Sequence, residues 1–360
     1  MNTASSFAGI VLCVAGIVGS GCGSSQQPPR EGAPPRNDEQ SSPSSSSSSS
    51  SAPSHRGRPF DLQGHRGARG HAPENTLEGF RRALAIGVTT LEMDLALTAD
   101  GVVVVHHDEA LNTDITRGAD GRYIDAAAAA PLRQLSGDAL SELDVGRIRP
   151  GTAYAMRFPD QVPVDGARIP TLAAVFALAE ELSGGTIRYN IELKRSPTHP
   201  DRTADPETFA RAALAAVDAA SVGDRVTFQS FDFACLDALR AVAGDAVDER
   251  SLACLTHTAD DPALWLGGRS LADHDGSWPA LVAAAHCDIW SPSFADLDGP
   301  AVEEAHALGL RVIPWTVNNP AQIAEAHALG VDGLISDYPD RVRADLAARG
   351  EELPIAFPAD

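Results

Sequence analysis

The chain has 360 residues, and 43% of them are hydrophobic, which is enough to bury a substantial core and excludes a wholly disordered protein. Its formal net charge of −21 argues against nucleic acid as a partner, because phosphate contacts need clustered Lys and Arg. The same charge argues against electrostatic binding to an anionic membrane. An anionic substrate would therefore need a locally positive site or a metal ion.

The first 22 residues (1–22) resemble a bacterial lipoprotein signal peptide. The apolar run FAGIVLCVAGIV at 7–18 is too short to span a bilayer but fits the core of a signal peptide. Cys22 follows in the sequence GSGC, and we expect it to become the lipidated first residue. No Lys or Arg precedes the run, and Gly19 stands where such signals usually carry an aliphatic residue. A plain secretory signal or a wrongly placed start codon therefore remains an alternative.

Residues 23–59 predict a disordered tether between this signal and a folded domain. The segment is rich in Ser and Pro and contains an unbroken serine run at 44–51, a composition that cannot form a packed core. We therefore expect an exported, membrane-anchored lipoprotein that faces the periplasm or the cell exterior. Its domain would contact the membrane only through the N-terminal lipid, since no later stretch is apolar enough for a transmembrane helix.

From residue 60 onward, short apolar strands alternate with Ala- and Leu-rich helical stretches. This pattern predicts an α/β fold, a TIM (β/α)8 barrel over 60–345, followed by a C-terminal tail at 346–360. A strand at 102–106 should form a hairpin with the second barrel strand. The long segment 109–171 is expected to be an insertion that forms a lid or subdomain over one mouth. The barrel strands are expected at 62–65, 90–95, 187–193, 226–230, 253–256, 288–291, 312–316 and 333–336.

Three carboxylates are expected at the carboxyl ends of two of these strands, where catalytic residues of β/α barrels lie. Glu92 and Asp94 are two residues apart, so both side chains face the same side of their strand, and Glu192 ends the next barrel strand. Burying them together without a cation would cost several kcal/mol each. The cluster therefore favours one divalent cation, Ca²⁺ or Mg²⁺, which prefers oxygen ligands. The alternative is that each carboxylate pairs with an arginine.

Two histidines and two basic residues complete this predicted set. His65 follows the first strand and His107 follows the hairpin strand, and two histidines beside a metal ion fit general acid–base chemistry near neutral pH. His106 alternates to the opposite face and is not expected to take part. Arg66 and Lys194, the only lysine of the chain, offer fixed positive charge to a phosphate.

Taken together, these motifs resemble the glycerophosphodiester phosphodiesterase family. The order of HRG, PENT, E-x-D, HHD, IELK and QSFD is highly specific, and the matches cover nearly the whole folded part. The matching segments are GHRGARGHAPENTLEGF (64–80), LEMDLALTADGVVVVHHDEAL (91–111), ARIPTLAAVFAL (167–178), NIELK (190–194), FQSFD (228–232), IPWTVN (313–318) and GVDGLISDYPD (330–340).

The resemblance implies a metal-dependent enzyme that hydrolyses a small-molecule glycerophosphodiester to glycerol 3-phosphate and an alcohol. It implies general acid and base roles for His65 and His107. Trp315 could instead belong to the barrel packing. The other positions that match are the metal ligands Glu92, Asp94 and Glu192, the phosphate contacts Arg66 and Lys194, the pocket residues Gln229 and Trp315, and the loop residues Glu74 and Asn75.

Other functions remain open at this point. A lysophospholipase D-like or sphingomyelinase D-like enzyme on the same barrel would need an apolar, aromatic-rich lip, and the aromatic content of 5% mildly favours water-soluble esters. Phospholipase C-like cleavage of phosphoinositides is a further alternative, and a non-enzymatic tethered binding module is one from another class. The preferred alcohol, the choice between Ca²⁺ and Mg²⁺ and the oligomeric state are not predicted.

Three cysteines fall in the expected folded domain: Cys235, Cys254 and Cys287. Because the number is odd, at most one disulfide can form among them. Their spacing matches no close-spaced metal-site pattern, so buried free thiols are the other interpretation.

Overall fold

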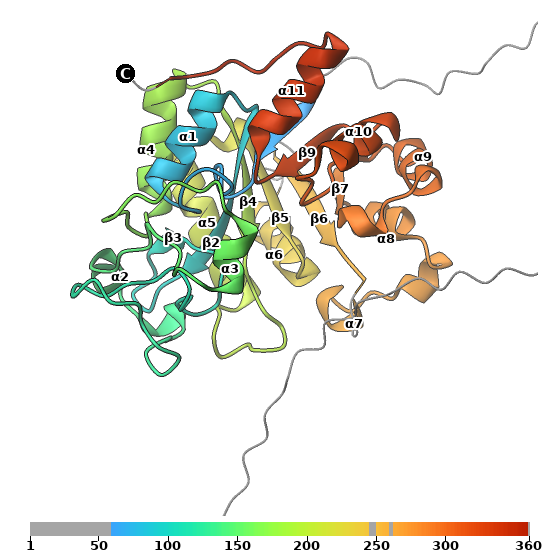
Figure 1. Ribbon diagram of the computed structural model, residues 1–360. Coiled ribbons are helices and arrows are strands. Elements are labelled where there is room, and N and C mark those ends of the chain that lie inside the picture. The colour runs from blue at the N-terminus through green and yellow to red at the C-terminus, as the bar shows by residue number, and fades with distance from the viewer. Residues whose placement is uncertain (1–58, 245–249, 259–261, 359–360) are drawn as a thin grey trace, which may run out of the picture. The chain divides into compact units, whose positions relative to one another are not determined.

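The computed structural model describes residues 59–244, 250–258 and 262–358 (Figure 1). The predicted signal peptide 1–22, with Cys22, lies outside the described residues, as does the predicted tether 23–59 except for its last residue. The described residues form a β/α barrel, which confirms the predicted fold class. No helix in the described ranges is long and apolar enough to cross a bilayer.

Eight parallel strands form the barrel, in the order β8-β7-β6-β5-β4-β2-β1-β9, and β3 pairs with β2 in the antiparallel sense. Backbone hydrogen bonds join the two ends of this path, since the amide of Val317 donates to the carbonyl of Ile335 at 3.0 Å. The strands are β1 (Asp61–Gly64), β2 (Thr90–Leu97), β3 (Val103–Val105), β4 (Arg188–Leu193), β5 (Val226–Ser230), β6 (Ser251–Thr256), β7 (Ile289–Pro292), β8 (Arg311–Val312) and β9 (Gly333–Ser336).

Strand β8, the seventh of the barrel in chain order, is shorter than the predicted range 312–316. Pro314 has no amide hydrogen and interrupts the ladder there. The amides on either side of it, Ile313 and Trp315, still donate to β7, to the carbonyls of Trp290 and Pro292, both at 3.0 Å. The chain therefore keeps its place in the barrel wall beyond the end of the regular strand.

Helices form the outer layer around the strands (Figure 1). Many begin at a side chain that accepts a backbone amide of the first turn, as Thr76 does for α1 and Asp205 for α5. The helices are α1 (Leu77–Ile86), α2 (Gly137–Ser141), α3 (Ala153–Arg157), α4 (Leu172–Ser183), α5 (Pro206–Ala220), α6 (Phe233–Ala243), α7 (Pro262–Trp265), α8 (Trp278–Ala284), α9 (Gly299–Ala307), α10 (Pro320–Ala328) and α11 (Pro339–Arg349).

The interior of the barrel is polar on the side of β1, β2, β4 and β5. The amide of Asn190 donates to Gln63 at 2.7 Å and to Gln229 at 2.9 Å. Alternate residues of these strands, such as Leu62 and Ile191, belong to the large core between the strands and the helices. The other side of the barrel interior is apolar, and its cluster comprises Ala253, Ile289, Ile313 and Ile335. Because side chains alternate along a strand, the polar side chains of these four strands point into the barrel interior.

The segment between β3 and α4 covers the predicted insertion, 109–171. It contains the short helices α2 and α3 and packs an apolar cluster against β2 and β3. Tyr154 from α3 donates a hydrogen bond to Glu74, which lies in the loop after β1. The insertion is thereby tied to the carboxyl end of the barrel. Its cluster consists of Ala96, Val104, Leu111, Leu132, Leu140, Val145 and Ile169.

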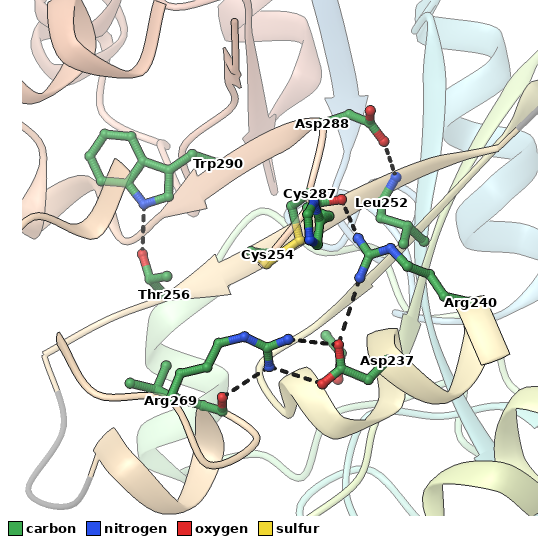
Figure 2. Close-up of a disulfide and its surroundings, with 12 residues drawn as sticks. Asp237, Arg240, Leu252, Cys254, Thr256, Arg269, Cys287, Asp288 and Trp290 are labelled. Carbon is green, nitrogen blue, oxygen red and sulfur yellow. Dashed lines mark hydrogen bonds and ion pairs between the residues drawn. A yellow bond between two sulfur atoms is a disulfide. The ribbon is translucent and has the colours of Figure 1, made fainter. Parts of the chain in front are cut away.

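One disulfide, Cys254–Cys287, joins β6 to the segment just before β7 (Figure 2). Its Cα atoms lie 5.9 Å apart and its cysteines are 33 positions apart in the chain. Beside it, the amide of Leu252 donates to the carboxylate of Asp288 at 2.8 Å, so the same pair of segments is also joined by a hydrogen bond (Figure 2). Cys235 is a buried free thiol. The pairing agrees with the expectation of at most one disulfide among the three.

Candidate active site

Three buried carboxylates of β2 and β4 lie together. Asp94 and Glu192 are register partners on these paired strands, and Glu92 lies two residues before Asp94. One oxygen from each of the three lies within 4.8 Å of the others. Burial, together with the charges of Asp94 and Glu192, raises the pKa of Glu92 well above its usual value. Burial also raises the pKa of Glu192, to about 7. This crowding of carboxylates fits a hard divalent cation.

Neighbouring side chains fix the orientation of these carboxylates. The side-chain amide of Gln229 donates to Oε1 of Glu92 at 2.8 Å, and the backbone amide of Arg66 donates to Oε2 at 2.8 Å. The side-chain amide of Asn75 donates to Oδ2 of Asp94 at 2.9 Å. Gln229 was predicted as a pocket residue, and it lines the cavity described below. Both ends of its side-chain amide are hydrogen-bonded to other side chains, the nitrogen to Glu92 and the oxygen to Asn190. Asn75 contacts a candidate metal ligand directly.

The two predicted phosphate-binding cations are ion-paired to carboxylates of the site. The Arg66 guanidinium lies 2.8 Å from Glu74 and 3.1 Å from Asp94. Nζ of Lys194 lies 3.0 Å from Glu192. Burial raises the pKa of Asp94, but the neighbouring basic groups, Arg66 first among them, together outweigh burial and hold that pKa well below the usual value. The alternative of an arginine partner for each carboxylate therefore applies to Asp94, whereas Glu192 pairs with a lysine.

The loop after β1 brings Arg66 and Asn75 to this point through tight backbone packing. Gly67 has a φ of 87°, and a Cβ there would lie 2.6 Å from the carbonyl carbon of Gly79 in α1. Glycine is needed where the backbone takes this conformation and approaches another backbone so closely. The amide of Asn75 donates back to the carbonyl of Arg66 at 3.0 Å, which closes the loop.

His65 is held by a buried carboxylate. Its Nδ1 lies 2.6 Å from Oδ1 of Asp337, which follows β9, and its Nε2 lies 3.9 Å from Oε2 of Glu92. Burial and the charge of Arg69 lower the pKa of His65 to about 4, so the ring is neutral near pH 7. We assign the ring hydrogen to Nδ1, where it is donated to Asp337. The lone pair of Nε2 then faces the carboxylate cluster.

His107 has a similar partner on the other side of the cluster. Its Nδ1 lies 2.7 Å from Asp108, which in turn accepts a hydrogen bond from Asn112 at 2.7 Å. Burial and the charges of Arg66 and Lys194 lower the pKa of His107 to about 4. The neighbouring His106 is buried and does not line the cavity that His107 faces.

Most of the predicted site residues line a cavity of about 320 Å³. Glu74, Asn75 and Asp94 do not line the cavity, but each contacts Arg66, which does. Trp315 lines the cavity, and its indole nitrogen donates to the carbonyl of Ser291 at 3.0 Å. The predicted residues that line it are His65, Arg66, Glu92, His107, Glu192, Lys194, Gln229 and Trp315.

Sequence reasoning missed several residues of the site. Asp337 follows the last strand, so the rule that polar residues at strand ends form the site would have found it. Asp108 lies in the HHD motif directly beside His107. Arg69 donates to Asp337 at 2.8 Å, and Tyr154 reaches in from the insertion. No spacing in the sequence indicates the position of Tyr154.

The chain is similar to known proteins. The model of the glycerophosphoryl diester phosphodiesterase family matches residues 65–341. The chain is 26% identical over 279 residues to a glycerophosphodiester phosphodiesterase of Caldanaerobacter subterraneus, covering 77% of this chain and 93% of that protein. It is 28% identical over 282 residues to one of Bacillus altitudinis, covering 77% and 94%.

Solved structures show the same relationship. A candidate glycerophosphoryl diester phosphodiesterase of Silicibacter pomeroyi has 34% sequence identity and a TM-score of 0.74, covering 83% of this chain and 96% of that one. An Oleispira antarctica phosphodiesterase, solved in complex with the product sn-glycerol-3-phosphate, has 21% identity and a TM-score of 0.60, covering 79% and 96%. The similarity to the Oleispira antarctica structure shows a shared fold.

Proposed function

The chain belongs to the glycerophosphoryl diester phosphodiesterase family and is a phosphoric diester hydrolase, and we propose that its reaction is metal-dependent and uses His65 and His107 as general acid and base. The substrate is a glycerophosphodiester, and the products are glycerol 3-phosphate and an alcohol. One observation carries this proposal: two imidazoles, each oriented by a carboxylate, lie in one cavity with a buried carboxylate cluster.

The residues present fit a divalent cation. Glu92, Asp94 and Glu192 would hold it through carboxylate oxygens, the ligands that both Ca²⁺ and Mg²⁺ prefer. When bound, such an ion neutralises charge on phosphate oxygens and lowers the cost of adding negative charge there. Arg66 and Lys194 supply further positive charge, and both line the cavity.

The two imidazoles would move the protons. One Nε2 accepts the proton of the glycerol hydroxyl beside the phosphate, and that oxygen forms a bond to phosphorus. The bond from phosphorus to the alcohol oxygen breaks, and the other imidazole donates a proton to the departing alcohol. Water then opens the cyclic phosphate with the two roles reversed, so that one water is consumed overall. The negative charge of the bound diester favours the protonated form of the imidazole that donates.

The direct test is release of glycerol 3-phosphate from glycerophosphocholine by the full chain. We expect release that needs added Ca²⁺ or Mg²⁺, stops with chelator, and falls by about 10²–10⁴ in His107→Ala. His106→Gln is the matched control, because His106 is adjacent in sequence and does not line the cavity. A loss of less than tenfold in His107→Ala would remove His107 from the acid–base pair. Metal binding without turnover would instead support the binding-module alternative.

We also propose that the protein is exported and anchored by lipid on Cys22. The apolar run at 7–18 and the Ser-rich stretch support this proposal. The Cys254–Cys287 disulfide supports it independently, because disulfides persist mainly in oxidising compartments. The test is incorporation of labelled fatty acid by cells that express the full chain. Cys22→Ser should abolish labelling and release the protein from the membrane fraction, and labelling that survives the change would contradict the proposal.

A further inference from the structure

A second, larger cavity of about 650 Å³ adjoins the active-site cavity. The two share a wall that includes His107, Glu192, Lys194 and Phe231. The rest of the larger cavity is built by loops after β3 and β4, the end of β6, and α7 and α8. A substrate whose phosphate lies at the carboxylate cluster could therefore extend past His107 into this space.

Aromatic and leucine side chains line the larger cavity, although aromatic residues are few in this protein. The whole chain has four tryptophans, and two of them, Trp265 and Trp278, line this cavity. Leu255 and Leu266, which are almost fully buried, line it as well, together with Leu111 and Phe231. Apolar groups that enter such a pocket leave water and gain contacts, which favours binding.

The charged groups of this cavity already have partners. Glu109 lies 3.5 Å from His199 and 3.9 Å from Arg202. Nζ of Lys194 lies 5.5 Å from the ring centroid of Phe231, so that ring already faces a cation. Recognition of a quaternary ammonium usually needs an open aromatic face or a free carboxylate. Each carboxylate that lines the cavity therefore has a partner, so a choline-like cation would find no free counter-charge there, whereas the aromatic and aliphatic surface can receive an apolar chain.

We propose that this cavity binds the alcohol part of the substrate and that the preferred alcohol carries an apolar chain. The proposal rests on the proposed phosphodiesterase function and names the substrate class within it. The glycerol phosphate part would occupy the smaller cavity with Arg66 and Arg69, and the leaving oxygen would lie beside His107 on the shared wall. The residues that would contact the apolar chain of the alcohol are Leu111, Phe231, Leu255, Trp265, Leu266 and Trp278.

The test uses the methyl, butyl and octyl esters of sn-glycerol 3-phosphate with the full chain, below the micellar concentration of the octyl ester. We expect kcat/KM to rise by about two- to fourfold per methylene while the alkyl chain stays within the cavity. Trp265→Ala and Trp278→Ala should each flatten this rise. Leu308→Ala is the control, because Leu308 is 46% exposed and lines neither cavity. It should leave the rise unchanged.

The outcomes separate this inference from the proposed function. Cleavage of all three esters at equal kcat/KM would overturn the inference and leave the phosphodiesterase function intact. Failure to cleave any ester would contradict the proposed function, and binding would then decide the inference by itself. A bromooctyl ester should quench tryptophan fluorescence in the parent protein, and less in Trp265→Ala than in Leu308→Ala. Absence of quenching by this ester would overturn the inference without any need for turnover.

Discussion

Asp337→Asn should cause a large loss of activity although Asp337 does not line the active-site cavity. All the neighbouring groups within hydrogen-bond distance of its carboxylate are donors. Oδ1 lies 2.6 Å from Nδ1 of His65 and 2.8 Å from Nε of Arg69, and Oδ2 lies 3.1 Å from Nη2 of Arg69 and 2.7 Å from the amide of Asn318. An asparagine would place an NH₂ group against two of these donors, whichever way its amide is turned.

Two costs follow from this conflict. If the amide nitrogen faces His65, the ring hydrogen must move to Nε2, and the lone pair that would accept the substrate proton is lost. With His65 as the general base, this loss should lower kcat by about 10²–10⁴. In either orientation the amide is neutral, so the buried Arg69 loses charge compensation and His65 loses the carboxylate that would stabilise its protonated ring. Breaking a buried ion pair in this way costs about 3–5 kcal/mol of stability.

The assay compares kcat and KM for glycerophosphocholine in the parent and variant, with thermal unfolding as a check on the fold. We expect kcat to fall and KM to change little, since Asp337 touches His65 and lies outside the cavity lining. Asp340→Asn is the matched control, because its 46% exposed carboxylate lies 2.6 Å from His71, which does not line that cavity. A folded Asp337→Asn protein with kcat within tenfold of the parent would refute the reasoning about His65.

Four further changes have expected outcomes. Cys254 and Cys287 close a loop of 33 positions, so the double change to Ser should cost about 3–4 kcal/mol and lower Tm by about 5 °C in calorimetry, with no further effect of reductant. Ca²⁺ or Mg²⁺ at a hundredfold excess over Kd should stabilise the parent by about 2.7 kcal/mol, and an equal gain in Glu192→Gln would contradict the metal site. Burial raises the pKa of Cys235, so its thiol stays protonated at pH 8.5 and should resist iodoacetamide until the protein is denatured, as peptide mapping would show. His107→Ala should lose less activity on a p-nitrophenyl ester than on a methyl ester if His107 protonates the leaving oxygen, and equal losses on both would contradict that role.

The sequence was sufficient for the barrel and for the carboxylate cluster, because both depend on local pattern. The predicted ranges 226–230 and 333–336 match β5 and β9 residue for residue. Glu92 and Asp94 share a face because strand side chains alternate with a period of two. Their approach to Glu192 then follows from strand pairing, since the ends of adjacent parallel strands meet at one edge. These arguments need no knowledge of packing.

The partners of the catalytic candidates could not be predicted in the same way. Asp337 is 272 positions from His65 in the chain, and they meet because β9 pairs with β1 to continue the barrel. Tyr154 reaches Glu74 from an insertion whose path has no periodic pattern. Gln229 was placed at the correct strand end, but the strand pattern could not show that its amide binds Glu92. Pattern gives the face of an element, whereas packing decides which side chain meets which.

Composition does not say where aromatic side chains lie in the fold. The aromatic content of 5% mildly favoured water-soluble esters, but it is an average over the whole chain. Binding depends on where the rings lie. Trp290 is fully buried, whereas Trp265, Trp278 and Trp315 line the two adjoining cavities. A chain with few aromatic residues can therefore still present an aromatic surface beside its reactive groups.

The negative charge of the protein opposes the binding of an anionic substrate. A phosphodiester is anionic, and it must approach a chain of net charge −21 whose cavity contains Glu92 and Glu192. Arg66 and Lys194 offset these carboxylates but are themselves ion-paired to Glu74, Asp94 and Glu192. A divalent cation would add two positive charges at the centre of the cluster and release part of that pairing for the phosphate. Cation and substrate should therefore bind cooperatively, each lowering the electrostatic cost of the other.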